Sequence, residues 1–190
     1  MFCYLMIYFL TICDYFNMTQ IIKLELISKY HCVLIRKTIW YKSINIKNDE
    51  IFDHIIKHYH FKNLYICVNV NVNHYVDYLQ KCHTLDLGGI NVNDETVKAL
   101  KNCHTLFLWE TDITDDSIKN LKCHTLDISW TNVTDEGIKN LKCHALDLTA
   151  TNITDKGVKN LKCRRLTVRK TKVTDACIQK LRSKGCTVYN

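Results

Sequence analysis

The sequence of 190 residues contains no proline and only five glycines, and it has no long apolar run. Without proline there is no proline-rich spacer between domains. With so few glycines there is no glycine-rich loop of the kind that holds phosphates. The opening apolar segment, residues 1–13, is shorter than the roughly 20 residues that a bilayer requires. It also lacks the basic stretch and cleavage site of a signal peptide, so we expect a buried N-terminal helix and no membrane partner.

Paired cysteines are also missing, although cysteine itself is abundant. The chain has 11 cysteines, and five of them recur at one nearly fixed spacing rather than in the pairs that a disulfide scaffold needs. We therefore expect reduced thiols and an intracellular protein, cytoplasmic or nuclear. Apolar residues make up 47% of the chain, which is enough for a core and argues against disorder.

A repeat organises most of the chain. Cys82, Cys103, Cys123, Cys143 and Cys163 are separated by 21, 20, 20 and 20 residues. Each begins the pattern Cys-x-x-Leu-x-Leu-x-x-Thr-x-Val-Thr-Asp-x-x-Ile-x-x-Leu, with conservative exchanges. Two degraded copies precede these five, so the repeats extend over most of the sequence.

Each copy combines two periodicities. Leu126 and Ile128 alternate with polar residues, which predicts a short strand with one buried face. Ile138 and Leu141 lie three residues apart, which places them on one face of a helix. Thr134, or the aspartate after it, is suited to cap that helix. One copy is therefore a strand, a turn and a helix.

A single copy cannot fold alone, because the burial of its few apolar side chains does not offset the entropy lost on ordering the whole copy. Stacked copies share hydrogen bonds between parallel strands and close one continuous core. The sequence therefore predicts an α/β solenoid of seven or eight parallel strands, with the helices on one side only.

The repeat pattern resembles a leucine-rich repeat of the cysteine-containing type, which carries Thr-x-Ile-Thr-Asp-x-x-Ile-x-x-Leu. The resemblance covers residues 43–190 and implies strands on a concave face and helices on the convex one. In that type the cysteine usually occupies the turn, where this chain has Thr111, Thr131, Thr151 and Thr171. Here cysteine takes the first apolar position instead.

A histidine follows four of the repeat cysteines, which raises the question of a metal site. Equivalent residues of stacked strands lie about 4.8 Å apart, and neighbouring residues of a strand point to opposite sides. The cysteines should therefore form a buried column that points away from the histidines, whereas zinc needs four converging ligands. We expect no metal and no cofactor; the alternative is a partly exposed histidine column that captures a transition metal. The histidines are His83, His104, His124 and His144.

The segment before the repeats resembles an F-box, a helical module that binds a Skp-family adaptor of a cullin-RING ubiquitin ligase. We assign it to residues 1–42 and expect helices from Asn17 to Ile44. Its most characteristic features are the run Leu26–Lys29 and the terminal Trp40. The alternative is a helical cap that covers the apolar edge of the first repeat. The resemblance assigns adaptor binding to Ile12, Phe16, Ile22, Leu24, Ile27, Leu34 and Trp40.

An F-box followed by leucine-rich repeats resembles, in its order, the substrate receptors of ubiquitin ligases, including those encoded by large DNA viruses. The resemblance implies a non-catalytic role inside the cell, which for the viral members is an infected host cell. The repeats would hold a target protein near the ligase. The alternative function is a repeat scaffold that binds protein without an adaptor. The sequence does not identify the target.

Target binding is expected on the outward-facing strand residues of the concave face. Asp127 and Asp147 belong to one column there, and paired carboxylates can do acid–base chemistry. No nucleophile accompanies them, so we do not expect an enzyme. Aromatic and arginine side chains commonly anchor interfaces, and the three aromatics on this face should form one patch, although single surface aromatics are also common. The expected target-binding residues are Phe107, Trp109, Asp127, Trp130, Asp147, Arg165 and Arg169.

Charge is distributed unevenly along the repeats. Residues 82–162 carry nine basic and twelve acidic side chains, a balance of −3, whereas residues 163–190 carry eight basic and one acidic, a balance of +7. The basic end is either a solvated cap or a site for an acidic or phosphorylated segment. Nucleic acid is not an expected partner, because the basic field covers one turn and lacks a known binding motif. The recurring lysines of the helices, such as Lys119, are interpreted as a solvated face.

Overall fold

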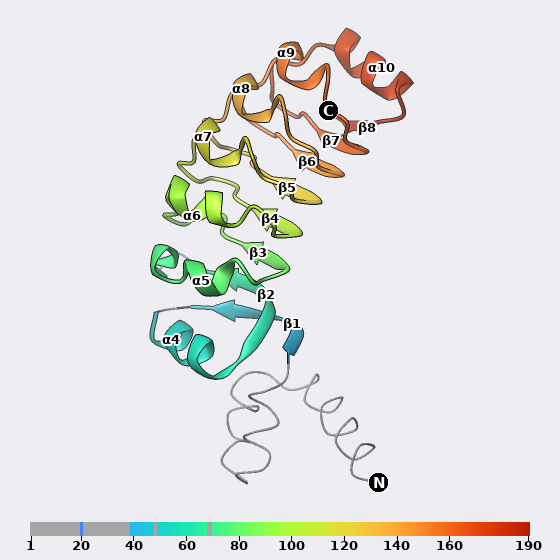
Figure 1. Ribbon diagram of the computed structural model, residues 1–190. Coiled ribbons are helices and arrows are strands. Elements are labelled where there is room, and N and C mark those ends of the chain that lie inside the picture. Colours follow the sequence, from blue (N-terminus) through green and yellow to red (C-terminus); the bar gives the residue numbers. More distant parts are fainter. Residues whose placement is uncertain (1–19, 21–38, 48, 68–69) are drawn as a thin grey trace, which may run out of the picture.

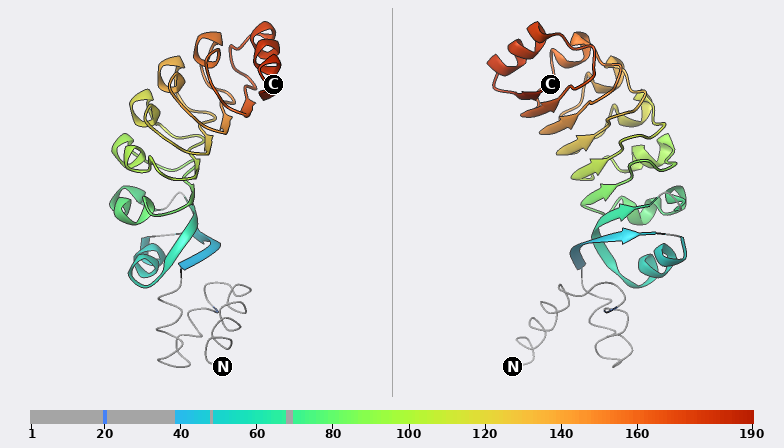
Figure 2. Two further views of the ribbon diagram at one scale, coloured as in Figure 1. Left: turned by 45° about the vertical axis from the view of Figure 1, so that its right-hand side comes forward. Right: turned by 180° about the vertical axis from the view of Figure 1, so that it is seen from behind.

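The computed structural model describes residue 20 and residues 39–47, 49–67 and 70–190, and in it the repeats form a solenoid (Figure 1). Eight parallel strands make one sheet in chain order, from β1 to β8. The helices cover one side of this sheet, and the strands line the concave side of the arc (Figure 2). The prediction of an α/β solenoid with seven or eight parallel strands and helices on one side is confirmed.

Strands and helices alternate along the chain. The strands are β1 (Ile39–Ile46), β2 (His60–Ile66), β3 (Thr84–Asp86), β4 (Thr105–Phe107), β5 (Thr125–Asp127), β6 (Ala145–Asp147), β7 (Arg165–Thr167) and β8 (Thr187–Tyr189). The helices are α4 (Asp49–His58), the 3-10 helix η1 (Val72–His74), α5 (Val76–Leu79), α6 (Asp94–Ala99), α7 (Asp115–Ile118), α8 (Asp135–Ile138), α9 (Asp155–Val158) and α10 (Asp175–Ser183).

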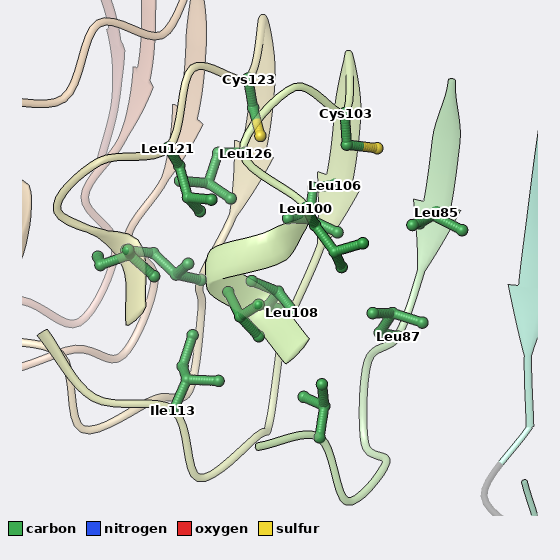
Figure 3. Close-up of a cluster of buried hydrophobic side chains, with 14 of the residues drawn as sticks. Leu85, Leu87, Leu100, Cys103, Leu106, Leu108, Ile113, Leu121, Cys123 and Leu126 are labelled. Carbon is green, nitrogen blue, oxygen red and sulfur yellow. The ribbon is translucent and has the colours of Figure 1, made fainter. Parts of the chain in front are cut away.

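The core lies between the sheet and the helices and runs through every repeat. Leu85, Leu106 and Leu126 are paired in register on successive strands, and all three are buried. Their side chains point into the same interior as Leu100 and Leu121, which come from the segments that follow the helices (Figure 3). Each repeat therefore completes the core of its neighbours, as the energetic argument from sequence requires.

The threonine of each turn has a defined structural role. Thr131 is buried, and its Oγ1 donates a hydrogen bond to the carbonyl oxygen of Ile128 at 2.7 Å. The hydroxyl thus satisfies a carbonyl group at the end of the strand, where the chain turns away from the sheet. The same bond, at 2.6 to 2.7 Å, is formed by Thr111, Thr151 and Thr171.

The Thr-Asp pair at the start of each helix joins neighbouring repeats. Asp135 accepts two hydrogen bonds from Thr154 of the next repeat, from the backbone N–H at 2.8 Å and from Oγ1 at 2.6 Å. Thr134 meanwhile caps its own helix, because its Oγ1 accepts from the N–H of Glu136 at 3.3 Å. We call the inter-repeat contact the Asp–Thr bridge. It recurs between Asp94 and Thr114, Asp115 and Thr134, and Asp155 and Thr174.

The degraded copies keep the same architecture with different side chains. Leu64 of β2 pairs in register with Leu85 of β3. In place of an aspartate, Asn73 accepts a hydrogen bond from the backbone N–H of Asn93 at 3.0 Å. An inter-repeat bond at this position is therefore retained where the repeat sequence itself is hard to recognise.

The first strand corrects one expectation. Helices were predicted from Asn17 to Ile44, but residues 39–46 form strand β1, so the prediction is wrong for residues 39–44. The backbone of Trp40, which was expected to end the helical module, pairs with Phe61 of β2. Isoleucine, tryptophan and tyrosine favour strands, and pairing with β2 gives this segment the ladder of hydrogen bonds that a helix would have supplied internally.

The remaining residues that were assigned to adaptor binding lie outside the described part of the chain, as does the expected helix over residues 1–13. Within the part that the structure describes, no helix is both long enough and apolar enough to cross a membrane. The expected adaptor-binding residues that lie outside the described part are Ile12, Phe16, Ile22, Leu24, Ile27 and Leu34.

The Asp–Thr bridge can be tested by comparing two aspartates at the same repeat position. Asp135→Ala removes both bonds to the next repeat and should lower the free energy of unfolding by about 1–3 kcal/mol, the range for hydrogen bonds to a charged group. Asp175→Ala removes the first-turn aspartate of α10, which bridges to no following repeat in the described residues. Urea denaturation followed by circular dichroism should therefore show a clearly smaller loss for Asp175→Ala. Equal losses would mean that the carboxylates act only on their own helices.

Candidate binding face

The concave face of the sheet carries one continuous column of outward-facing side chains. The parallel register places equivalent residues of successive strands side by side, so a column spans all repeats. It combines carboxylates in its centre with aromatic rings at both ends and at one position between. From β2 to β8 the column contains Tyr65, Asp86, Phe107, Asp127, Asp147, Thr167 and Tyr189.

A hollow of about 300 Å³ opens in the C-terminal half of this face. Four of the seven expected target-binding residues line it, namely Phe107, Asp127, Asp147 and Arg165. Tyr189 lines it as well and closes its C-terminal side from the last strand. We call this site the concave hollow. It brings an aromatic ring, two carboxylates, a guanidinium group and a phenol together on a sheet whose backbone is fixed by hydrogen bonds.

Each of the two carboxylates of the concave hollow accepts a hydrogen bond from the backbone of its own turn. Oδ1 of Asp127 accepts a hydrogen bond from the N–H of Ser129 at 2.9 Å, and Oδ1 of Asp147 accepts one from the N–H of Thr149 at 2.8 Å. Burial raises the pKa of Asp127, and the nearby carboxylates of Asp147 and Asp86 add to this effect, although the bonds from Ser129 oppose it. A cation placed here would stabilise the ionised form of Asp127, because its attraction would offset both the repulsion from the other carboxylates and the cost of desolvation.

Trp109 has a structural reason to lie where it does. A Cβ atom added at Gly88 would fall 2.0 Å from the indole ring, so the ring packs directly against that glycine of the preceding repeat. Gly89, the next residue, has a φ of +68°, and a Cβ atom added there would lie 3.5 Å from the same ring. The indole ring of Trp109 therefore packs against both glycines, and Trp109 is 37% exposed.

Trp130 is positioned differently from Trp109. It has a φ of +57°, in the left-handed region, and its side chain is 57% exposed. The Nζ atom of Lys170 lies 5.0 Å from the centre of its ring, which is a cation–π contact with a residue two repeats further on. Among the described residues no ring contact joins Trp109, Trp130 and Phe107, and their expected grouping in one patch stays a prediction.

The two expected arginines and the residue that the sequence analysis missed lie at the C-terminal end. Arg165 and Arg169 are both exposed, and neither forms an ion pair within the described part of the chain. Tyr189 was missed from the sequence because the last copy has its strand residue Val188 two positions after Cys186 rather than three. The residue after Val188 therefore falls in the aspartate column, which only the strand pairing reveals.

The repeat cysteines form the predicted inward column, with one correction. Cys103, Cys123 and Cys143 are buried in the core and form no disulfides. Burial raises the pKa of Cys103 and of Cys143 to about 11 each. Cys163 was also expected to be buried, but it is only half-buried.

The four histidines stack on the opposite side of the strands from the cysteines. Their ring centroids are 4.3, 4.6 and 4.4 Å apart, and neighbouring planes differ by 12° to 16°. Parallel rings send their nitrogen lone pairs in the same direction, whereas a metal needs them to converge. The described residues contain no group of three or more potential ligands placed to hold a metal ion. We call this stack the histidine column.

The concave parallel sheet, the short convex helices and the continuous ladder of leucines define a leucine-rich repeat solenoid. The family model described as Leucine Rich repeat matches residues 124–142 and 144–162, which are the two most regular copies. No curated protein matches the chain significantly. The fold class is thus supported both by the repeat sequence and by the structure.

The protection of the cysteine column should be visible in the native protein. Thiolate is the reactive form, so the raised pKa and the burial of Cys103 and Cys143 should make both slow to alkylate at neutral pH. Exposed Cys67 should be labelled quickly, and Cys163 at a rate between the two groups. Peptide mapping by mass spectrometry after timed iodoacetamide treatment checks this, with labelling in denaturant as the control. Native labelling of Cys123 as fast as Cys67 would contradict the buried column.

Proposed function

We propose that this chain is a non-catalytic protein-binding protein and that the concave hollow holds a segment of its partner. The observation that carries this proposal is the composition of the hollow, in which Phe107, Asp127, Asp147, Arg165 and Tyr189 meet on one rigid surface. Aromatic and arginine side chains are frequent anchors of protein interfaces. A sheet with a fixed register presents them at little cost in conformational entropy, which favours binding.

The charges in the hollow indicate what kind of segment fits. Asp127 and Asp147 favour a lysine or arginine side chain of the partner, because each carboxylate is already held by a backbone N–H and forms no ion pair within the described residues. Phe107 and Tyr189 offer apolar surface beside them. Arg165 in the wall of the hollow, with Arg169 further along, would pair with an acidic or phosphorylated group of the same segment.

A catalytic role is not supported by the same residues. The lining of the hollow includes two carboxylates but no histidine, lysine or cysteine that could act with them as a base or nucleophile. Both carboxylates also accept hydrogen bonds from their own turns. The regular spacing of the aspartates follows from the repeat, so their presence requires no reaction to explain it.

The N-terminal segment supplies the second part of the proposed function, by binding a Skp-family adaptor of a cullin-RING ubiquitin ligase. This part rests on the resemblance of residues 1–42 to an F-box and on its position before leucine-rich repeats. The protein would then act as a substrate receptor, as in similar proteins encoded by large DNA viruses. The alternative is a repeat scaffold that binds protein without an adaptor. A measurement of adaptor binding distinguishes these two functions.

Removing the two negative charges of the concave hollow tests whether the hollow is the binding site. The double variant Asp127→Asn and Asp147→Asn keeps the shape of both side chains and an oxygen that can accept from the turn. It should reduce capture of the partner about tenfold or more, because a charged pair worth about 1.4 kcal/mol is lost. Capture is measured by quantitative mass spectrometry of proteins labelled by proximity in cells that express the chain.

The control for this experiment removes two acidic charges from the outer helices. Glu95→Gln and Glu136→Gln lie on α6 and α8, both are exposed, and together they change the net charge by the same amount. Their partner set should match that of the unaltered protein. If the concave variant also recovers the same partners at unchanged yield, the hollow is not the binding site.

Adaptor binding is tested on the full chain and on a truncated one. Leu24→Ala with Ile27→Ala should abolish retention by a Skp-family adaptor in a pull-down. Deletion of residues 1–38, which leaves strand β1 intact, should do the same while circular dichroism still reports folded repeats. Retention of the adaptor by the deletion variant would refute the F-box assignment and favour the scaffold alternative.

A further inference from the structure

A second charged surface lies where each helix leads back into the next strand. We define the basic edge as the histidine column together with Arg164 and the lysines Lys101, Lys122, Lys142, Lys162 and Lys184. Backbone hydrogen bonds hold its columns in register, from Lys122 N to Lys101 O at 3.0 Å and from Arg164 N to His144 O at 2.9 Å. The edge therefore runs across the repeats as a continuous strip.

Two neighbouring hollows lie along the basic edge. One of about 500 Å³ is lined by Lys122, Lys142 and Lys162 together with the asparagines of the same loops. The other, of about 480 Å³, is lined by Lys162, Arg164 and Lys184. Because both include Lys162 and Asn160, they form one extended groove. No carboxylate lines either of them.

The positive charge of this strip is not neutralised within the protein. Lys119 and Lys139, at the helix ends, form ion pairs with Asp116 and Glu136. In the described residues Lys122, Lys142 and Lys162 form no ion pair. The acidic residues of the repeats are concentrated instead in the first turns of the helices and on the concave face.

Stabilisation of helix ends does not account for these lysines. A cation in the last turn of a helix interacts favourably with its C-terminus, but the effect fades within that turn. Lys119 and Lys139 are the C-cap residues of α7 and α8, so they fit this explanation. Lys122 and Lys142 follow three residues later, after a leucine that enters the core, and they line the groove together with Lys119 and Lys139.

The histidine column presents ring edges and not ring faces. His104 and His124 are stacked on both faces, and His83 and His144, at the ends of the stack, on one face each. The Nδ1 atoms of His83 and His104 lie 3.1 Å from the hydroxyl oxygens of Thr84 and Thr105. The Nε2 atoms have no partner within the described part of the protein, so they are left for an external acceptor.

We infer that the basic edge is a second interaction surface, separate from the concave hollow, and that it takes an acidic helical segment of another protein. The observation behind this inference is that the spacing of the imidazole rings is close to the spacing of carboxylates along one face of a helix. The imidazole centroids recur every 4.3 to 4.6 Å. A helix rises about 1.5 Å per residue, so carboxylates three or four residues apart on one face recur every 4.5 to 6 Å, roughly.

Other polyanions fit this surface less well. Single-stranded nucleic acid is usually held by bases that stack on aromatic faces, whereas six of the eight faces of these imidazoles are occupied by one another. A flat anionic membrane would meet only the rim, because the lysines surround a groove whose lining includes the nearly buried Leu121 and Leu141. A narrow helix bearing one row of carboxylates can follow the groove and reach the ring edges together.

Binding at this edge should strengthen as the pH falls. Burial lowers the pKa of His104, and His83 and His124 lower it further; burial also lowers that of His144, with His124, Arg165 and Arg164 adding to the effect. No carboxylate is among the groups that act on these two rings. A bound acidic helix supplies the missing negative charge, so binding takes up protons and is favoured below the ordinary histidine pKa of about 6.5.

The test uses the full chain and a fluorescent alanine-rich helical peptide with glutamates at positions i, i+3, i+7 and i+10. A control peptide has the same composition with the glutamates spread around the helix. Anisotropy titration at pH 7.5 in about 0.1 M salt should show clearly tighter binding of the first peptide. The triple variant Lys122→Gln, Lys142→Gln and Lys162→Gln should weaken binding about tenfold, as expected for three exposed ion pairs.

The matched control variant removes three lysines from the outer helices, Lys98→Gln, Lys156→Gln and Lys180→Gln, and should change affinity less than about twofold. From pH 7.5 to 5.5 the affinity of the unaltered protein should rise by about tenfold, and His104→Gln with His144→Gln, which removes the two rings whose pKa values are lowered, should clearly reduce that rise. The inference is overturned if the two peptides bind equally, if the lysine variants behave alike, or if an RNA oligonucleotide or phosphatidylserine vesicles bind at least as tightly as the first peptide.

Discussion

The parallel hydrogen-bond ladder between successive repeats is the constraint on which the rest of this structure depends. Each strand in the regular copies is only three residues long, so a strand gains its stability from its two neighbours rather than from its own length. The ladder fixes the register, and the register then stacks like side chains on like. The Asp–Thr bridge repeats this principle at the helix ends, where Asp135 joins its repeat to Thr154 of the next.

A fixed register turns a repeated sequence into columns of defined chemistry. Cysteine and leucine columns fill the core, a column rich in aspartate faces the concave side, and histidines and lysines line the basic edge. Acidic and basic side chains are thereby concentrated on different faces, although the net charge of residues 82–162 is only −3. Such a molecule presents two surfaces of unlike charge, which is consistent with the proposed binding of a partner on the concave face and of a second one at the basic edge.

The period made the repeat core predictable, and local exceptions to the period account for what sequence reasoning missed. Leu106, Cys123 and Ile138 are buried where their spacing placed them. Tyr189 escaped notice because the last copy is one residue shorter between its cysteine and its strand. The packing of Trp109 against Gly88 was not predicted, because it depends on a neighbouring repeat, which a single-copy pattern does not encode. Residues 39–44 were read as helix because their strand character depends on pairing with β2.

The central claim is that partners bind on the concave side of the sheet, and site-specific photo-crosslinking tests it most directly. Benzoylphenylalanine in place of Tyr189 preserves an aromatic ring in the wall of the concave hollow, where the native side chain is 46% exposed. The same residue in place of Glu136 samples the outer helix α8. The account predicts cross-linked partner protein from position 189 and none from position 136. Cross-links that form from position 136 alone would contradict it.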